Sequence, residues 1–360
     1  MNILIFDVPA ESGGALSILT EFYNEVKNHE DKTISWTFVL SKPEFQETDN
    51  IKIFRFPWIK KSWLHRIYFD QVIAPILVKK LCANKIFSMQ NVIIPRTNVE
   101  QVVYVHQPLP FVDYKFKFIE NQLFWINQNI IGKKIYKAIR NAPKIIVQMD
   151  WFKQACIEKT GVAAEKIEVV APQINVNVKK FFSADSNAMS TFFYPSSAIS
   201  YKNHRVVVDA CKILKSQNIT DYKVLLTLDG HENNNISELK KTVEENDLPI
   251  AFIGHCSRDK VFNYYAESVL VFPSYIETFG LPMLEAKLHG GIVFASNNSF
   301  SHEILDDYSN AYFFDSFNGS ELAALMLKSI DGEIAYHEID KVTNPKNTNQ
   351  KFSLINSILG

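Results

Sequence analysis

Two glutamates, Glu277 and Glu285, stand in the segment PSYIETFGLPMLEAKLHGG, which follows the apolar run SVLVF. The apolar run predicts a buried strand, and LPMLEAKLH predicts a helix that begins after a loop. Pro282 suits the first turn of that helix, because its missing N–H would have no partner there. Two carboxylates at the junction of a buried strand and a helix raise the question of which ligand they serve.

Phosphate is the ligand that the backbone of this junction would favour. The amides of Thr278, Phe279, Gly280 and Leu281 would lie at the start of the helix, where free N–H groups and the helix dipole attract anions. Glu285, one turn inside the helix, would accept hydrogen bonds from ribose hydroxyls, and Glu277 would meet a sugar hydroxyl or a developing positive charge. The segment therefore predicts a cradle for a nucleotide sugar. A loop with two solvent-facing glutamates is the alternative.

The elements that position this segment alternate along the chain between short apolar runs and longer amphipathic stretches. Such alternation predicts βαβ crossovers and parallel sheets, and 360 residues exceed one ordinary hydrophobic core. We expect an N-terminal domain over 1–175 and a C-terminal domain over 176–345, with a helix at 346–360 that returns to the first. The expected strands are NILIFDV, SWTFVL, IKIFRF, NVIIP, QVVYVH, KIIVQ, KIEVVAP, TFFYPS, KVLLTLDG, IAFIG, SVLVFPS and GIVFAS.

The charge of the chain is unevenly distributed. Residues 1–180 carry 24 Lys and Arg against 17 Asp and Glu, and within 51–146 the counts are 16 and 4. This basic region would attract an anionic membrane surface, while nucleic acid or a merely solvated face are the other interpretations. The four cysteines are scattered, which argues against a zinc site or a disulfide framework. No secretory leader or long apolar run is visible, so we expect a soluble or peripheral protein.

The stretch WLHRIYFDQVIAPILVKKL (63–81) is a long amphipathic segment interrupted by Pro75. An ordinary core-facing helix bent by the proline is the interpretation that we favour here. An interfacial helix whose aromatic side chains enter a bilayer is the alternative.

The segment ETFGLPMLE resembles the E-x7-E signature of the retaining glycosyltransferases with a GT-B fold, specifically family 4, also called group 1. The resemblance implies an α/β fold of GT-B architecture, with two Rossmann-like parallel-sheet domains facing each other across a cleft. It also implies transfer of a sugar from a nucleotide-diphosphate sugar with retention of the anomeric configuration.

Further residues are assigned by the same resemblance. ESGGAL resembles the Gly-rich loop after the first strand, which implies that Gly13 and Gly14 approach the donor. YPSSAISYKNH resembles the opening of the second domain, where a lysine binds the diphosphate, and Lys202 occupies that position. Ser196 and Ser197 stand where many members of the family carry an arginine, and the resemblance implies that they bind the donor beside Lys202.

First-domain residues follow in the same way. VVYVHQPLPF resembles the strand end that carries a histidine toward the sugar, so His106 joins Lys202 and Glu277 as a candidate catalytic residue. A structural hydrogen-bonding role is the alternative for a lone histidine. SMQNVIIP and IIVQMDWFK resemble other segments at the active-site side of this domain. They place Gln90, Asn91, Gln148 and Trp151 on the acceptor side.

The implied reaction needs no cofactor or metal besides the donor, a UDP- or GDP-sugar. The implied acceptor is a saccharide, in particular a lipid-linked oligosaccharide of bacterial surface polysaccharide (O-antigen or capsule) synthesis. We expect a cytoplasmic enzyme, either free or peripheral at the inner face of the membrane, without a nucleic-acid partner. A nucleotide-sugar epimerase or a sugar phosphorylase is one alternative, and a non-catalytic sugar-nucleotide-binding scaffold subunit is another.

Overall fold

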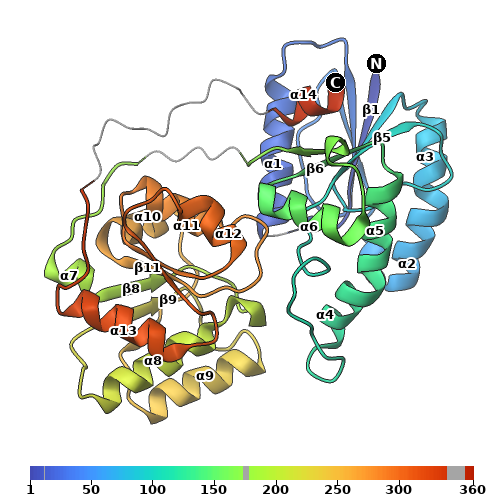
Figure 1. Cartoon of the computed structure of the whole chain (residues 1–360). Helices are drawn as coiled ribbons and strands as arrows, with labels where there is room; N and C mark the ends of the chain where they lie inside the picture. Colours follow the sequence, from blue (N-terminus) through green and yellow to red (C-terminus); the bar gives the residue numbers. More distant parts are fainter. Residues whose placement is uncertain (12, 173–177, 339–352) are drawn as a thin grey trace. The chain divides into compact units, whose positions relative to one another are not determined.

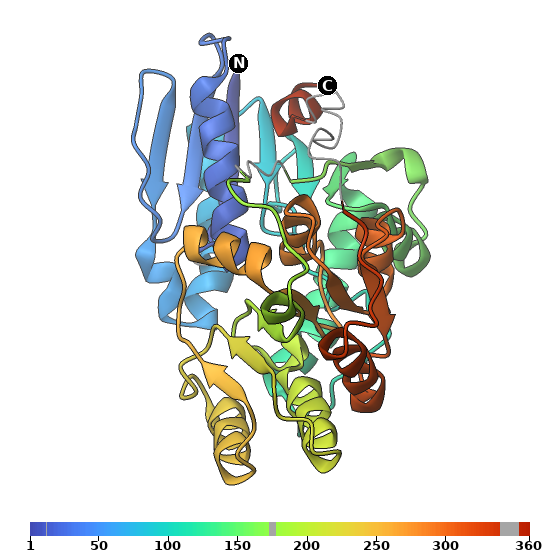
Figure 2. The same cartoon turned by 90° about the vertical axis from the view of Figure 1, so that its left-hand side faces the viewer.

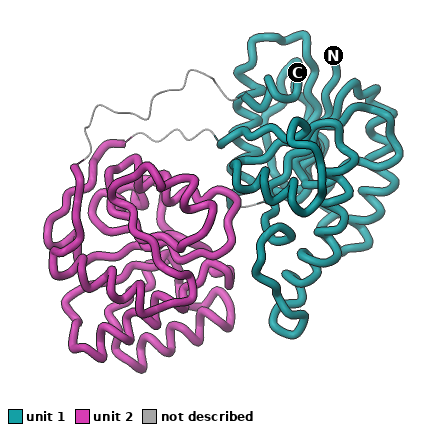
Figure 3. Tube along the Cα trace, in the orientation of Figure 1, with its two compact units in different colours: residues 1–174, 350–360 teal, residues 175–349 magenta. Residues whose placement is uncertain are grey.

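A computed structural model describes residues 1–11, 13–172, 178–338 and 353–360. The chain divides into two compact units, residues 1–174 with 350–360 (unit 1) and residues 175–349 (unit 2), as Figure 3 shows. Both units are built on parallel sheets with intervening helices, so the predicted α/β fold class with two parallel-sheet domains is confirmed.

Unit 1 is built on a parallel sheet of seven strands within its described residues, in the order β3-β2-β1-β4-β5-β6-β7 (Figure 1). The strands are β1 (Asn2–Asp7), β2 (Ser35–Leu40), β3 (Ile51–Arg55), β4 (Lys85–Ser88), β5 (Glu100–Tyr104), β6 (Lys144–Val147) and β7 (Ile167–Val169). The helices are α1 (Gly13–Asn28), α2 (Trp63–Tyr68), α3 (Ala74–Lys80), α4 (Gln122–Ile126), α5 (Gly132–Asn141), α6 (Asp150–Thr160) and α14 (Leu354–Leu359). Short 3-10 turns (Pro57–Lys61, Ala164–Lys166) and π-helical turns (Phe69–Ile73, Asn127–Ile131) complete the unit.

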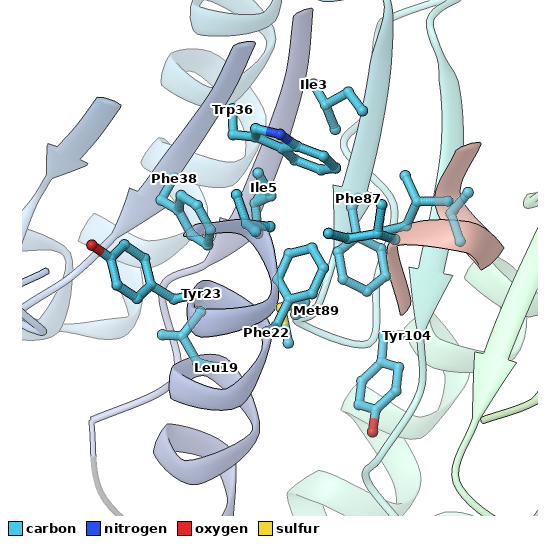
Figure 4. Packing of buried hydrophobic residues seen from close by; sticks show 14 of the residues in the cluster. Ile3, Ile5, Leu19, Phe22, Tyr23, Trp36, Phe38, Phe87, Met89 and Tyr104 are labelled. Atoms are coloured by element: carbon cyan, nitrogen blue, oxygen red, sulfur yellow. The ribbon is translucent and has the colours of Figure 1, made fainter. Parts of the chain in front are cut away.

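The core on one face of this sheet is aromatic (Figure 4). Phe22 of α1 lies with its ring centroid 5.0 Å from that of Phe87 and 6.2 Å from that of Trp36, both in edge-on geometry. All three side chains are almost fully buried. Edge-on aromatic pairs stabilise a core beyond their buried area, so these contacts hold α1 against strands β2 and β4 of the sheet.

The prediction of a strand at NVIIP (91–95) is wrong, because the strand at this place is β4, a few residues earlier. Gln101 explains the difference: its side-chain amide donates to the carbonyl of Ile94 and accepts from the N–H of Ile94, each at 2.8 Å. The backbone groups of Ile94 are thus satisfied by a side chain instead of a neighbouring strand. Asn91 also adopts a positive φ of 66°, which ends the extended run.

The prediction of an ordinary core-facing helix over 63–81 is wrong for its first part. Within α2 no residue is buried, and its large apolar side chains point to solvent, while Ala74 and Val78 of α3 are buried. The π-helical turn Phe69–Ile73 joins the two helices. Pro75 cannot donate to the carbonyl of Gln71, and the guanidinium of Arg96 donates to it at 3.2 Å instead.

The last described helix, α14, packs on unit 1 although it follows unit 2 in the sequence (Figure 1). Ile355 and Ile358 belong to the core cluster beneath α1 and are 1% and 0% exposed. Lys85 of β4 donates through its ammonium to the carbonyl of Ile358 at 2.8 Å. Ser357 donates to the carboxylate of Glu168 at 2.7 Å.

Unit 2 contains a parallel sheet of six strands within its described residues, in the order β10-β9-β8-β11-β12-β13 (Figure 2). The strands are β8 (Thr191–Tyr194), β9 (Lys223–Leu226), β10 (Ile250–Phe252), β11 (Val269–Phe272), β12 (Val293–Ser296) and β13 (Ala311–Phe314). The helices are α7 (Ser186–Met189), α8 (His204–Ser216), α9 (Asn234–Glu245), α10 (Arg258–Glu267), α11 (Leu281–Leu288), α12 (Ser299–Leu305) and α13 (Gly319–Ile330), with a 3-10 turn at Ser200–Lys202. Strands β4 and β13 are absent from the sequence-based strand list. Among the helices of the described residues, none has the length and apolar character to span a bilayer.

Candidate functional site

The order of the second sheet reverses between β8 and β11, which are hydrogen-bonded neighbours. In open parallel sheets, ligands bind outside the carboxyl ends of the strands at such a reversal point. The loop after β8 carries Ser196, Ser197 and Lys202, and the loop after β11 carries Glu277 through Leu281. The residues predicted from the sequence to bind the donor diphosphate therefore lie in the two loops that leave this point.

The two loops are joined by an ion pair between the ammonium of Lys202 and the carboxylate of Glu277. Both side chains are largely shielded from solvent, with exposures of 17% and 14%. The Lys202 ammonium also lies 5.9 Å from the centroid of the Tyr201 ring. An ammonium in this shielded position is a ready partner for a diphosphate, which would compete with Glu277 for it.

Backbone hydrogen bonds fix the position of Lys202. The buried hydroxyl of Tyr194 donates to the Lys202 carbonyl at 2.8 Å. The carbonyl of Tyr201 accepts from the N–H of Tyr275 at 3.1 Å and from the hydroxyl of Ser274 at 3.2 Å. The next residue, Asn203, has a positive φ of 58° and begins α8, and its amide donates to the carbonyl of Ser316 at 2.5 Å. The β8 loop is thus fastened to the β11 loop at several points.

Helix α11 begins as the sequence pattern predicts, with a proline in its first turn and Gly280 before it. Gly280 has a φ of 90°, a conformation that side chains with a Cβ rarely adopt. A Cβ at this position would also lie 2.5 Å from the terminal methyl of Met283. The turn follows Glu277 in the sequence, so the first N–H groups of the helix come shortly after the residue that pairs with Lys202. Phe279 is 9% exposed, so its side chain packs inward.

Glu285 lies one turn inside α11 and is bonded to α10. The hydroxyl of Tyr265 donates to one carboxylate oxygen at 3.0 Å, and the guanidinium of Arg258 lies 3.4 Å from the other. Burial raises the pKa of Glu285 above its usual value, while the Tyr265 hydrogen bond and the Arg258 charge oppose this shift. Tyr265 is 1% exposed and held in the core, so it fixes the direction of the carboxylate.

Ser196 is engaged in bonds within the protein. Its N–H donates to the hydroxyl of Thr227 at 3.0 Å. Its hydroxyl lies 2.7 Å from the Nε2 of His204. Burial, with a smaller effect from the Lys202 charge, lowers the pKa of His204 to about 4, so this ring is neutral at physiological pH. Ser197 is exposed beside it.

In unit 1, His106 lies just beyond the carboxyl end of β5. The side-chain oxygen of Asn91 accepts from the N–H of His106 at 2.7 Å and from the N–H of Gln107 at 3.0 Å. Asn91 therefore fixes the backbone that carries the histidine. Burial lowers the pKa of His106 to about 4, so the imidazole is uncharged at physiological pH.

The other residues predicted for the acceptor side are spread along the same carboxyl edge of unit 1. Gln148 is 3% exposed and hydrogen-bonds the hydroxyl of Tyr104, and Gln90 is 5% exposed. Trp151, in the first turn of α6, is partly buried and packs against the core beside Phe152. This packing accounts for the side chain without an acceptor. Gly13 and Gly14 begin α1 just after β1, and a Cβ added at either glycine would have no atom within 4 Å.

Sequence reasoning missed a buried polar group at this edge. Asp7, the last residue of β1, is 1% exposed, and one of its carboxylate oxygens has no hydrogen-bond partner among the described residues. Burial raises its pKa to about 8, against the charges of Arg66 and Lys60. The sequence does show a carboxylate directly after the apolar run NILIF, and this was the signal by which Asp7 could have been found. Tyr265 was missed because a tyrosine on an amphipathic helix is indistinguishable from a packing residue.

Comparisons with known proteins agree with this architecture. Residues 179–344 match the family described as Glycosyl transferases group 1, and a comparison with curated protein sequences gives no match. The sucrose-phosphate synthase from Thermosynechococcus elongatus is similar, with 15% identity, a TM-score of 0.69 and coverage of 92% of this chain and 90% of that one. Anabaena HepE in complex with UDP and glucose has 17% identity, a TM-score of 0.65 and coverage of 93% and 92%.

The lipopolysaccharide outer core galactosyltransferase WaaB has 14% identity, a TM-score of 0.64 and coverage of 94% of this chain and 92% of that one. At these identities the likeness concerns the fold. The family match spans nearly all of unit 2, including the Lys202 loop and the E-x7-E segment. The match agrees with the group 1 resemblance noted in the sequence, and it covers residues 179–344 of the chain.

Proposed function

We propose that this protein is a retaining glycosyltransferase of family 4. It transfers a sugar from a nucleotide-diphosphate sugar to a saccharide acceptor. The observation that supports this most is the shielded Lys202–Glu277 ion pair at the reversal point of the second sheet, immediately before the N-terminus of α11. An ammonium and the N-terminal amides of a helix are groups that stabilise the charge of a diphosphate leaving group.

Each residue has a role in this reaction. Lys202 and the amides at 278–281 stabilise the diphosphate as the bond from its oxygen to the anomeric carbon breaks. The acceptor oxygen bonds to the same face of that carbon, and its proton passes to the departing diphosphate. Glu277 binds hydroxyls of the transferred sugar and Glu285 binds those of the ribose. Gly13 and Gly14 let the first unit's backbone approach the donor.

His106 acts as a neutral group in this proposal. Its lowered pKa keeps the imidazole uncharged, so it accepts or donates a hydrogen bond to the sugar without contributing a positive charge. Asn91 positions it through the backbone. Gln90 and Gln148 lie on the acceptor side in this assignment.

The donor is a UDP- or GDP-sugar, and the presence of UDP with the structurally similar HepE favours UDP. The acceptor is a lipid-linked oligosaccharide of bacterial surface polysaccharide synthesis. The structural likeness to an outer core galactosyltransferase and the basic region at 51–146 support this acceptor. The enzyme would act in the cytoplasm, at an anionic membrane surface.

A thermal-shift experiment with UDP, GDP and their sugars tests the donor site. Ligand at about one hundred times its Kd stabilises the folded state by about 2.7 kcal/mol. That should raise the melting temperature of the wild type by roughly 5–10 °C. Lys202→Ala and Glu285→Ala should lose most of the shift. Lys180→Ala is the matched control, because Lys180 also pairs with a glutamate of unit 2, Glu267, at 2.7 Å but is exposed.

The transferase is then distinguished from a scaffold subunit by turnover. Incubation with the identified donor and a panel of lipid-linked saccharides should yield a glycoside with the anomeric configuration of the donor, read by NMR. Donor binding without any transfer or hydrolysis would favour the non-catalytic scaffold. A product of inverted configuration would refute the retaining assignment.

A further inference from the structure

The first helix of the 63–80 stretch has its polar and apolar faces reversed relative to a core-facing helix. Trp63, Leu64, Ile67 and Tyr68, at helical spacing, are 55%, 77%, 45% and 53% exposed. Residues separated by three or four positions share one face of a helix. Four large apolar side chains of α2 therefore form one outward face, whereas a helix that packs on a core buries such a face.

The inward side of the same helix is polar. Arg66 donates to the carboxylate of Asp70 at 2.7 Å and to the side-chain oxygen of Gln90 at 3.0 Å. This bonding sets the rotation of the helix about its axis. The exposure of Trp63 and its neighbours is thus held in place by specific hydrogen bonds to the body of unit 1.

A second exposed apolar segment precedes and begins α4, in the sequence YKFKFIENQL (114–123). Phe118, Ile119 and Leu123 are 48%, 96% and 55% exposed. Lys115 and Lys117 alternate with the aromatic side chains and are also exposed. Alternation of basic and aromatic side chains is typical of segments that bind anionic lipid, because the rings enter the interface while the ammonium groups meet phosphates.

Both segments lie at the same edge of unit 1. Helix α2 follows β3 and α4 follows β5, and parallel strands place their carboxyl ends together. Figure 1 shows both helices at the end of unit 1 away from the N-terminus. This is also the edge at which His106, Gln90 and Gly13 lie.

We propose that these two segments form a surface by which unit 1 docks on an anionic lipid bilayer. Trp63, Leu64, Ile67, Tyr68, Phe118 and Ile119, here called the apolar rim, enter the interface. Lys61, Lys115 and Lys117, which are exposed and close to these residues in the sequence, meet the lipid phosphates. Charge complementarity favours an anionic bilayer over a protein partner as the occupant, because residues 51–146 have a net charge of +12.

The inference deepens that part of the proposed function that places the acceptor at a membrane. Vesicle binding tests it with neither donor nor acceptor present. A failure here therefore leaves the transferase proposal standing, and a failure of transfer leaves the docking surface standing. A bilayer at this edge would deliver a lipid-linked saccharide next to the acceptor side of unit 1.

Flotation of the full chain with vesicles of phosphatidylglycerol and phosphatidylcholine, against vesicles of phosphatidylcholine alone, is the test. We expect binding to the anionic vesicles that weakens with salt. Trp63→Ser and Ile119→Ser should each weaken it roughly tenfold. Lys61→Gln and Lys117→Gln should each weaken it about fivefold. Phe317→Ser is the matched control, because Phe317 is an apolar side chain of unit 2 with 63% exposure, and it should bind like the wild type.

Three results would overturn the proposal. One is the absence of vesicle binding by a protein whose melting curve is normal. Another is vesicle binding that Trp63→Ser and Ile119→Ser leave unchanged. The last is light scattering that shows a wild-type oligomer which the same substitutions dissociate, since the rim would then join copies of the chain. The substituted side chains are exposed, so their loss should not prevent folding.

Discussion

At the scale of single residues, the Lys202–Glu277 ion pair predicts a competition within the proposed donor site. The ammonium is held by a carboxylate that the diphosphate must displace. Glu277→Gln should therefore strengthen the binding of UDP alone by about two- to fivefold, in keeping with the free energy of such an ion pair. Isothermal titration calorimetry measures this. Sugar transfer by the same variant should fall, because the sugar hydroxyls lose their partner.

Glu267→Gln supplies the comparison for that experiment. Glu267 pairs with Lys180 on an exposed part of unit 2, and its loss should leave the affinity for UDP unchanged. Equal or weaker binding of UDP by Glu277→Gln would show that Glu277 does not compete with the diphosphate.

Tyr265 is a positioning residue in the proposed reaction. Tyr265→Phe removes only the hydroxyl that donates to Glu285 at 3.0 Å. A hydrogen bond to a charged group contributes about 1.5–3 kcal/mol, so KM for the donor should rise at least about tenfold while kcat changes little. Tyr264→Phe, at the neighbouring position of α10, is the control. If KM stays at the wild-type value, the hydroxyl is only a core group.

Asp7 gives the folding stability a dependence on pH. Its pKa is about 8 in the folded protein and near its usual value, about 4, in the unfolded chain. Between these values the folded state holds a proton that the unfolded state has lost, so stability falls as pH rises. The contribution is about 1.4 kcal/mol per pH unit. Denaturant titrations of Asp7→Asn should show a shallower fall from pH 5 to 8, with the variant gaining on the wild type. Parallel curves would refute the raised pKa.

At the scale of elements, α14 fills a site on unit 1 that the rest of that unit leaves open. Ile358 is 0% exposed among residues of β1, β4 and α1. Ile358→Ala should lower the free energy of unfolding of unit 1 by about 2–5 kcal/mol. Hydrogen exchange of the unit 1 amides measures the effect. Leu359→Ala, at a partly buried neighbour, should cost distinctly less, and equal losses would contradict the assigned packing.

The elements also show where sequence reasoning succeeds. Apolar runs such as SVLVF and NILIF predict their strands because both faces of a parallel sheet are covered. NVIIP has the same composition and is no strand, since the side chain of Gln101 satisfies the backbone of Ile94. Residues 94 and 101 meet only because of the fold, so the composition of the segment around Ile94 does not reveal their contact. The outward face of α2 is a similar case, because its periodicity is that of a core helix.

At the scale of the whole molecule, the sequence predicted two parallel-sheet domains and the loops that carry Lys202 and Glu277. The pattern was sufficient because strand, loop and helix follow one another within a few residues there. Partners that come from separate elements, such as Tyr265 for Glu285 or Arg66 for Gln90, could not be predicted. Such pairs depend on how helices rotate against the sheet.

The attachment of α14 to unit 1 has a consequence for synthesis on the ribosome. Domains ordinarily fold in the order in which they emerge. Here the final helix of unit 1 is translated only after all of unit 2. The nascent first unit must wait with Lys85 and its apolar neighbours uncovered until that helix leaves the exit tunnel. Unit 2 can therefore fold before the core of unit 1 is complete.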